Sequence, residues 1–114
     1  MTWSAPKALS NPATAGLQQG SRPVVGPNGE VYVVWSEIGP VDADFFYLRK
    51  STDFGLTFSP QVLANSHFAN FGTGAPGFNR DRSVDFPSVA VDRTTGPHRG
   101  RVYMAWHESI NWYN

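Results

Sequence analysis

Short runs of β-branched and aromatic residues alternate along the chain with clusters of glycine and proline. The clearest run is 30–36, EVYVVWS, which lies between the turn-forming sequences GPNG and IGP. Such a run with turn residues on both sides predicts a β-strand. The sequence RPVV at 22–25 predicts a second, shorter strand. The GPNG between them predicts a tight turn, because glycine adopts positive φ without steric cost.

Two further strands are predicted after this pair. Residues 44–50, DFFYLRK, alternate between two faces, one of which becomes more polar toward the end of the run. Residues 57–64, TFSPQVLA, predict a fourth strand, and Pro60 places it at a sheet edge because proline cannot donate to a central ladder. The stretch 66–81 has no period and predicts a long loop.

The pattern returns in the last part of the chain. Residues 86–92, FPSVAVD, and 101–108, RVYMAWHE, predict two strands, and the turn-forming sequence RTTGPHRG lies between them. The composition of residues 110–114, INWYN, predicts the start of another strand. With 11 glycines and 9 prolines in 114 residues, few stretches could hold a helix of ten residues. We therefore expect an all-β fold within one small domain.

Composition excludes several classes of protein. Lys and Arg together equal Asp and Glu together, nine each, so the formal net charge is zero, which argues against a dedicated nucleic-acid binder. Cysteine is absent, which excludes a disulfide scaffold and a thiolate zinc site but leaves the compartment open. No apolar run approaches the roughly 20 residues of a membrane span, and no signal peptide is visible. We expect no membrane association.

An internal repeat relates the two halves of the chain. The signature G-x-V-Y-x-x-W-x-E occurs twice, and shorter matches flank it. Each unit is roughly 55 to 60 residues with four strands, which is the size of a propeller blade. The matched residues are Gly29, Val31, Tyr32, Trp35 and Glu37 with Gly100, Val102, Tyr103, Trp106 and Glu108; Pro23 and Val25 with Pro87 and Val89; and Thr2-Trp3-Ser4 with Thr57-Phe58-Ser59.

The turn between the third and fourth predicted strands carries a second motif. Ser51-x-Asp53-x-Gly55-x-Thr57-Phe58 resembles the Asp-box, the S-x-D-x-G-x-T-W turn of sialidase-like β-propellers, also called the BNR repeat. Asp53 can accept hydrogen bonds from its own turn, Gly55 can be left-handed, and Ser51 and Thr57 can tie the two sides together. Our main interpretation is a structural clip. A metal or sugar site at Asp53 is the alternative.

The resemblance implies two four-stranded propeller blades in each chain, with the ring completed by oligomerisation. We expect residues 1–10 to be an outer strand that completes a blade of a neighbouring copy, 21–64 a full blade, and 65–114 an incomplete one. A head-to-tail homo-oligomer would cover the open sheet edges. Three copies would give six blades, the number in sialidases. The alternative is a fragment of a larger propeller, and Met1 directly before a partial motif is typical of an engineered or excised piece.

Candidate ligand contacts come from both repeats. The resemblance implies that a sialidase site needs three arginines, a Tyr–Glu pair and an acidic proton donor, and no such catalytic set is found. Arg22 and Arg82 lie near prolines but out of register with the family pattern, and the simpler interpretation is that they are surface residues or form inter-blade salt bridges. Glu37 and Glu108 end equivalent strands and could line a pore or cap a strand. Trp112 and Tyr113 are candidates for exposed aromatic contact.

Metal and cofactor sites are not predicted. His67, His98 and His107 lack the spacing of metal ligands. Asp42 and Asp44 could bind Ca²⁺, although two carboxylates in a loop are more often solvated. Trp35 and Trp106 are expected to pack between blades.

Three functions remain as hypotheses. The first is a self-assembling propeller module with a mainly structural role, and the second is a lectin-like binder with repeated weak glycan sites. The third is a glycoside hydrolase of sialidase type. The loop 66–81 is where a ligand-specific contact is expected. Proteins of the resembled family are often secreted, but the localisation of this chain is left open.

Overall fold

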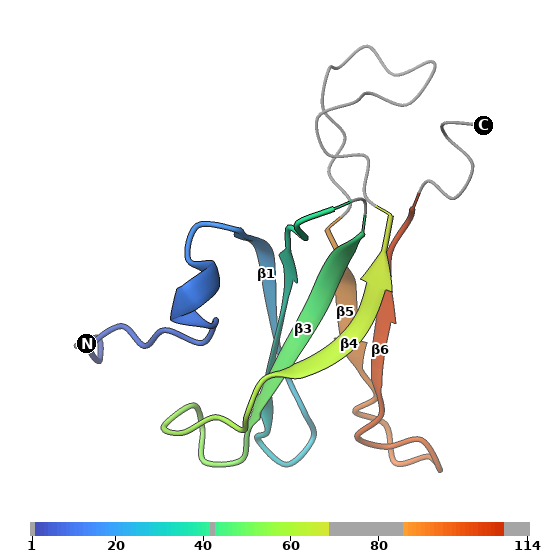
Figure 1. Ribbon diagram of the computed structural model, residues 1–114. Helices are drawn as coiled ribbons and strands as arrows, with labels where there is room; N and C mark the ends of the chain where they lie inside the picture. The colour runs from blue at the N-terminus through green and yellow to red at the C-terminus, as the bar shows by residue number, and fades with distance from the viewer. Residues whose placement is uncertain (1, 42, 69–85, 109–114) are drawn as a thin grey trace.

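The computed structural model describes residues 2–41, 43–68 and 86–108, and these form an all-β fold (Figure 1). Arg82, Asp42, Trp112 and Tyr113, and most of the predicted loop, lie outside the described residues. The all-β prediction is confirmed. In chain order the elements are a 3-10 helix η1 (Pro12–Thr14) and the strands β1 (Gln18–Val25), β2 (Val31–Glu37), β3 (Asp44–Ser51), β4 (Val62–His67), β5 (Ser88–Val91) and β6 (Val102–Ala105).

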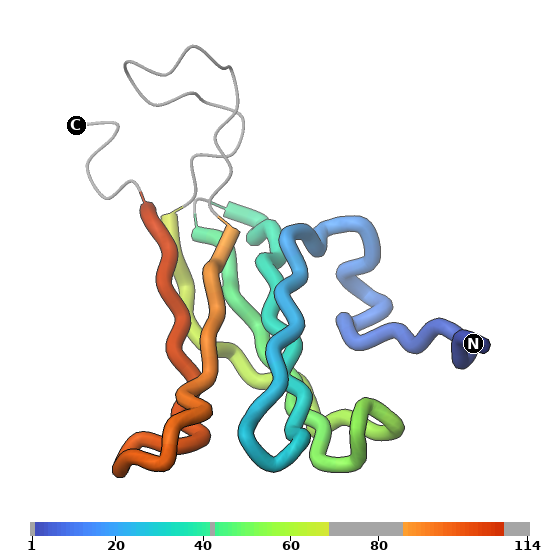
Figure 2. The backbone as a smooth tube through the Cα atoms, turned by 180° about the vertical axis from the view of Figure 1, so that it is seen from behind, coloured from blue at the N-terminus to red at the C-terminus, as the bar shows by residue number. Residues whose placement is uncertain are grey.

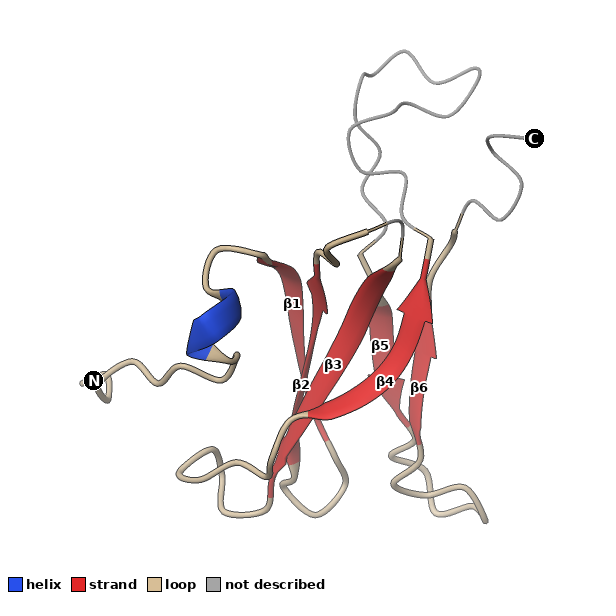
Figure 3. Ribbon diagram, in the orientation of Figure 1, coloured by secondary structure: helices blue, strands red, loops and turns tan. Residues whose placement is uncertain are grey.

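The first sheet is an antiparallel meander in the order β1-β2-β3-β4 (Figure 3). The predicted GPNG turn joins β1 to β2, where the Gly26 N–H donates to the Glu30 carbonyl at 2.7 Å and Gly29 has φ 86°. The edge strand β1 contains Pro23, which lacks an N–H and is tolerated because only β2 pairs with this strand. The register of β1 shifts between Gln19 and Arg22.

The fourth strand begins later than the sequence predicts. We expected it over 57–64, but β4 spans Val62–His67 because the preceding turn is longer. That turn is closed by the Ser59 N–H, which donates to the Lys50 carbonyl at 2.7 Å. Pro60 therefore lies outside the ladder, although the strand does occupy a sheet edge as predicted.

The second sheet consists of β5 and β6, which are shorter than the predicted strands over 86–92 and 101–108. Their connecting loop is closed by the Gly100 N–H, which donates to the Asp92 carbonyl at 2.7 Å. From behind, β5 runs beside β1 (Figure 2), but the two strands belong to separate sheets. The described residues thus contain one four-stranded and one two-stranded sheet, and the predicted pair of four-stranded blades stays a prediction.

The core lies between the two sheets. Side chains alternate in direction along a strand, so Tyr32 and Val34 of β2 share one face of the first sheet, which we call the covered face. Phe46 of β3 is fully buried on this face, and its ring stacks on His67 with centroids 3.9 Å apart. The Trp106 ring, just after β6, meets Phe46 edge-on at 5.4 Å. The second sheet therefore packs on the covered face.

The N-terminal segment, residues 2–10, forms no strand within the single chain, where we expected an outer strand over 1–10. It extends beside the first sheet (Figure 1), and Lys7 Nζ donates to the Leu56 carbonyl. The segment leads into η1, whose first turn is capped by Asn11 Oδ1 accepting from the Ala13 N–H at 3.0 Å. Pairing of this segment with a neighbouring copy stays a prediction.

Candidate functional site

The turn that carries Asp53 is held by hydrogen bonds between its own residues. Asp53 Oδ1 accepts from the Thr57 N–H at 2.8 Å and from the Ser51 hydroxyl at 2.7 Å, and Asp53 Oδ2 accepts from the Thr57 hydroxyl at 2.5 Å. The Gly55 N–H donates to Ser51 Oγ at 2.8 Å, and Gly55 has φ 86°. Both carboxylate oxygens of Asp53 are therefore engaged by neighbouring residues in the turn.

These bonds stabilise the ionised form of Asp53. They lower its pKa to about 2, chiefly through the Thr57 hydroxyl, then through the Thr57 N–H and the Ser51 hydroxyl. Phe58 is half-buried beside the turn, whereas Phe54 is exposed and has φ 58°. Within the described parts of the chain, no three His, Cys, Asp or Glu residues gather to hold a metal ion. The contacts of Asp53 support the structural interpretation of this turn.

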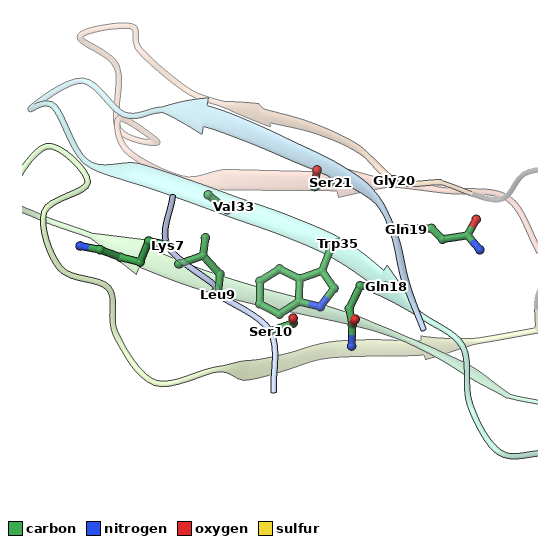
Figure 4. Close-up of a pocket in the computed structure, with 9 residues that line it drawn as sticks. All are labelled: Lys7, Leu9, Ser10, Gln18, Gln19, Gly20, Ser21, Val33 and Trp35. Atoms are coloured by element: carbon green, nitrogen blue, oxygen red, sulfur yellow. The ribbon is translucent and has the colours of Figure 1, made fainter. Parts of the chain in front are cut away.

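A groove lies on the other face of the first sheet, opposite the covered face. We call this the receiving face, and in β2 it carries Val31, Val33 and Trp35. The groove has a volume of about 420 Å³ and lies between this face and the N-terminal segment (Figure 4). Its lining combines an apolar floor with polar side chains, and consists of Lys7, Leu9, Ser10, Gln18, Gln19, Gly20, Ser21, Val33 and Trp35.

Trp35 is the most buried aromatic side chain of the receiving face. Its residue is 3% exposed, and its ring lies 6.2 Å from that of Tyr47 on β3. The indole Nε1 is buried and has no hydrogen-bond partner. Leaving a buried donor unpaired costs about 1–3 kcal/mol. The Trp35 indole N–H is therefore a buried donor that carries this cost.

Glu37 is fixed at the end of β2 by Gln18. The Gln18 side-chain nitrogen lies 3.0 Å from Glu37 Oε2, and also 2.6 Å and 2.8 Å from the carbonyl and hydroxyl oxygens of Thr14. These contacts tie the start of β1 and the helix η1 to the end of β2. Glu37 is only 6% exposed, so its carboxylate serves this local network.

The other predicted contact residues are not brought together with Glu37. Arg22 is exposed and pairs with Val34, which places it on the covered face, whereas Glu37 shares the receiving face with Trp35. Glu108 is exposed and accepts from the Phe68 N–H at 3.0 Å. Asp44 Oδ1 accepts from the Gly39 N–H at 2.9 Å, which closes the turn before β3.

The two repeats differ in how far equivalent residues are buried. Tyr32 is 9% exposed on the covered face, whereas its equivalent Tyr103 is 46% exposed in β6. Val34 is fully buried, whereas Ala105, at the corresponding position, is exposed. We call this exposed side of the second sheet its outer face, which consists of Ser88, Ala90, Tyr103 and Ala105. The repeat pattern identified these positions, but their unequal burial is visible only in the structure.

Comparison of the chain with models of known protein families, with curated proteins and with solved structures finds no match. Among the residues described, no helix is long and apolar enough to cross a membrane.

Proposed function

We propose that this chain is a self-associating β-sheet module, built like consecutive blades of a sialidase-like β-propeller, whose main role is structural. The unequal burial of Tyr32 and Tyr103 carries this proposal. In the first sheet the position is buried on the face on which the second sheet packs, and in the second sheet the equivalent position is exposed. A further sheet from another copy would give Tyr103 the environment that Tyr32 already has.

The outer face lacks a cover, and the surface of another copy that would cover it is a different one. The copies would therefore associate head-to-tail. Such a heterologous contact closes into a ring when the rotation between units allows it. With two sheets in each chain, three copies would form a six-sheet propeller, which is the ring we favour. Zero formal net charge is compatible with this, since no overall repulsion holds the copies apart.

A concentration series tests the proposal. We expect sedimentation velocity of the wild-type chain to show a defined oligomer at micromolar concentrations and above. The variant Tyr103→Glu places a charge on the outer face and should remain monomeric, because a buried unpaired charge opposes docking. The matched control Tyr103→Phe keeps the ring and should associate like the wild type. A folded wild-type monomer throughout the series would overturn the proposal.

Glycan binding in the groove is a second candidate function. The observation that favours it is the groove itself, which brings Trp35 and Val33 together with polar groups of Gln18 and Ser10 (Figure 4). A sugar would place an apolar ring face against Val33 and exchange hydrogen bonds with the polar side chains through its hydroxyl groups. NMR titration with a panel of oligosaccharides should then shift the Trp35 indole N–H signal in the wild type. A panel without any such shift at millimolar sugar would contradict this candidate.

Glycoside hydrolysis is not proposed. It requires two carboxyl groups roughly 5 to 9 Å apart on either side of a sugar. Glu37 is committed to Gln18, and Arg22 points to the opposite face of the sheet.

A further inference from the structure

The receiving face of the first sheet has an equivalent that is already docked within the same chain. By the repeat, Val31, Val33 and Trp35 correspond to Val102, Met104 and Trp106. The second set lies on the side of the second sheet that packs on the covered face, where Trp106 meets Phe46 at 5.4 Å. The chain thus contains one example of such a surface packed against a neighbouring sheet.

The same contact can be repeated between copies. In the chain, the covered face at Tyr32 and Val34 is occupied by the chain's own second sheet. On the second sheet, the surface equivalent to the covered face is the outer face at Tyr103 and Ala105, and this surface remains open. The outer face of a second copy would therefore pack on the receiving face, as the equivalent two surfaces pack within the chain.

The N-terminal segment lies where that copy would dock. Leu9 and Ser10 line the groove against Trp35 and Val33, as Figure 4 shows. Trp35 is only 3% exposed although the described second sheet lies on the opposite face. The segment and a docked sheet cannot occupy this surface at the same time.

The segment is a poor permanent cover. Residues 2–8 are exposed, and the tie from Lys7 to the Leu56 carbonyl lies at the exposed turn. Under the segment, Trp35 Nε1 still lacks an acceptor.

We propose that the N-terminal segment is a removable cover of the receiving face, and that a second copy docks its outer face there only after the segment has left. This inference rests on the proposed self-association and adds its regulation. The free chain is then divided between closed and open forms, and only the open form can receive a copy. Apparent affinity is lowered in proportion to the open fraction.

A covalent tether tests the cover directly, since the chain contains no cysteine of its own. Lys7→Cys and Leu56→Cys place thiols at the exposed tie without altering Trp35 or Val33. Joining them with a short bismaleimide should hold the segment closed and cause a loss of detectable association, because no open form is left to receive a copy. The same double variant with each thiol capped by N-ethylmaleimide is the matched control.

The opposite variant loosens the cover. Lys7→Met removes the donor to Leu56 but keeps the length of the side chain, and should lower the dissociation constant of self-association. If the tethered chain associates as well as its capped control, or if Lys7→Met leaves the dissociation constant unchanged, the cover is refuted and the proposed function stands. If the capped control and Lys7→Met both remain monomeric at every concentration, self-association itself is refuted, and the cover with it.

Discussion

The first and second sheets of this chain place equivalent residues in different surroundings. Tyr32 and Val34 are enclosed by the second sheet, whereas Tyr103 and Ala105 face outward. The first sheet also has the N-terminal segment against its receiving face, through Leu9 and Lys7. For the two tyrosines the residue type is the same, so the difference comes from position in the chain, which is the behaviour of repeat units whose stability depends on their neighbours.

The largest effect is expected where the two sheets meet. Phe46→Ala would remove a fully buried ring that stacks on His67 and touches Trp106, and should lower the free energy of unfolding by about 3–5 kcal/mol. Phe45→Ala, one residue earlier and on the opposite face, is the matched control and should cost markedly less because Phe45 is only half-buried. Urea denaturation measures both. Equal losses of unfolding free energy in the two variants would mean that the core does not lie between the two sheets.

The repeat-equivalent tyrosines sharpen the comparison itself. At low protein concentration, Tyr32→Ala should cost about 3 kcal/mol, whereas Tyr103→Ala should cost less than about 1 kcal/mol. At concentrations where copies associate, the cost of Tyr103→Ala should rise, because its ring is then covered as well. Urea unfolding at two protein concentrations checks this. A Tyr103 effect that does not depend on concentration would argue against a partner on the outer face.

A smaller effect is expected at the junction between the sheets. Gly20 has φ 63°, and a Cβ there would lie 2.4 Å from the ring of Phe86. Gly20→Ala should therefore cost about 1–3 kcal/mol from strain and displacement of the ring. Gly16→Ala provides the control for strain alone, since Gly16 has φ 90° with open space around it. If thermal unfolding shows equal losses, the contact of β1 with Phe86 adds nothing to stability.

The strands of the first sheet were predictable to different degrees. The run 30–36 predicted β2 within one residue, because its β-branched and aromatic residues are bounded by turn residues on both sides. The start of β4 was predicted wrongly, because the turn continues to Ser59, whose N–H donates to the Lys50 carbonyl, and so includes the first residues of the predicted strand. Turn chemistry decided this boundary.

The candidate site was harder to predict from the sequence than the strands. The sequence predicted that Trp35 and Trp106 pack between blades; in the structure Trp106 meets Phe46 across the two sheets, whereas Trp35 lies against the N-terminal segment. The groove could not be predicted, because it depends on Leu9 reaching a strand more than twenty residues later in the chain. A pattern of neighbouring residues cannot predict such a contact, and nothing in the residue types of Leu9 and Lys7 distinguishes them from other positions.

The smallest expected effect concerns the Asp53 turn, which joins β3 to β4. The pKa of Asp53 is lowered from 3.8 to about 2, mainly by the Thr57 hydroxyl. Because the folded pKa lies below the unfolded value, ionised Asp53 stabilises the turn fully above about pH 4, and this contribution is lost as the pH falls toward 2.

Carboxyl-detected NMR titration should place the Asp53 midpoint near 2 in the wild type. Thr57→Val removes the strongest donor while keeping the side-chain shape, so it should raise the midpoint toward 3.8. Asp53→Asn should abolish the part of the pH dependence of unfolding that falls between about 4 and 2. A wild-type midpoint near 4 would mean that these hydrogen bonds do not persist in solution. The turn would then be held by the left-handed backbone of Gly55 and by the ladder between β3 and β4.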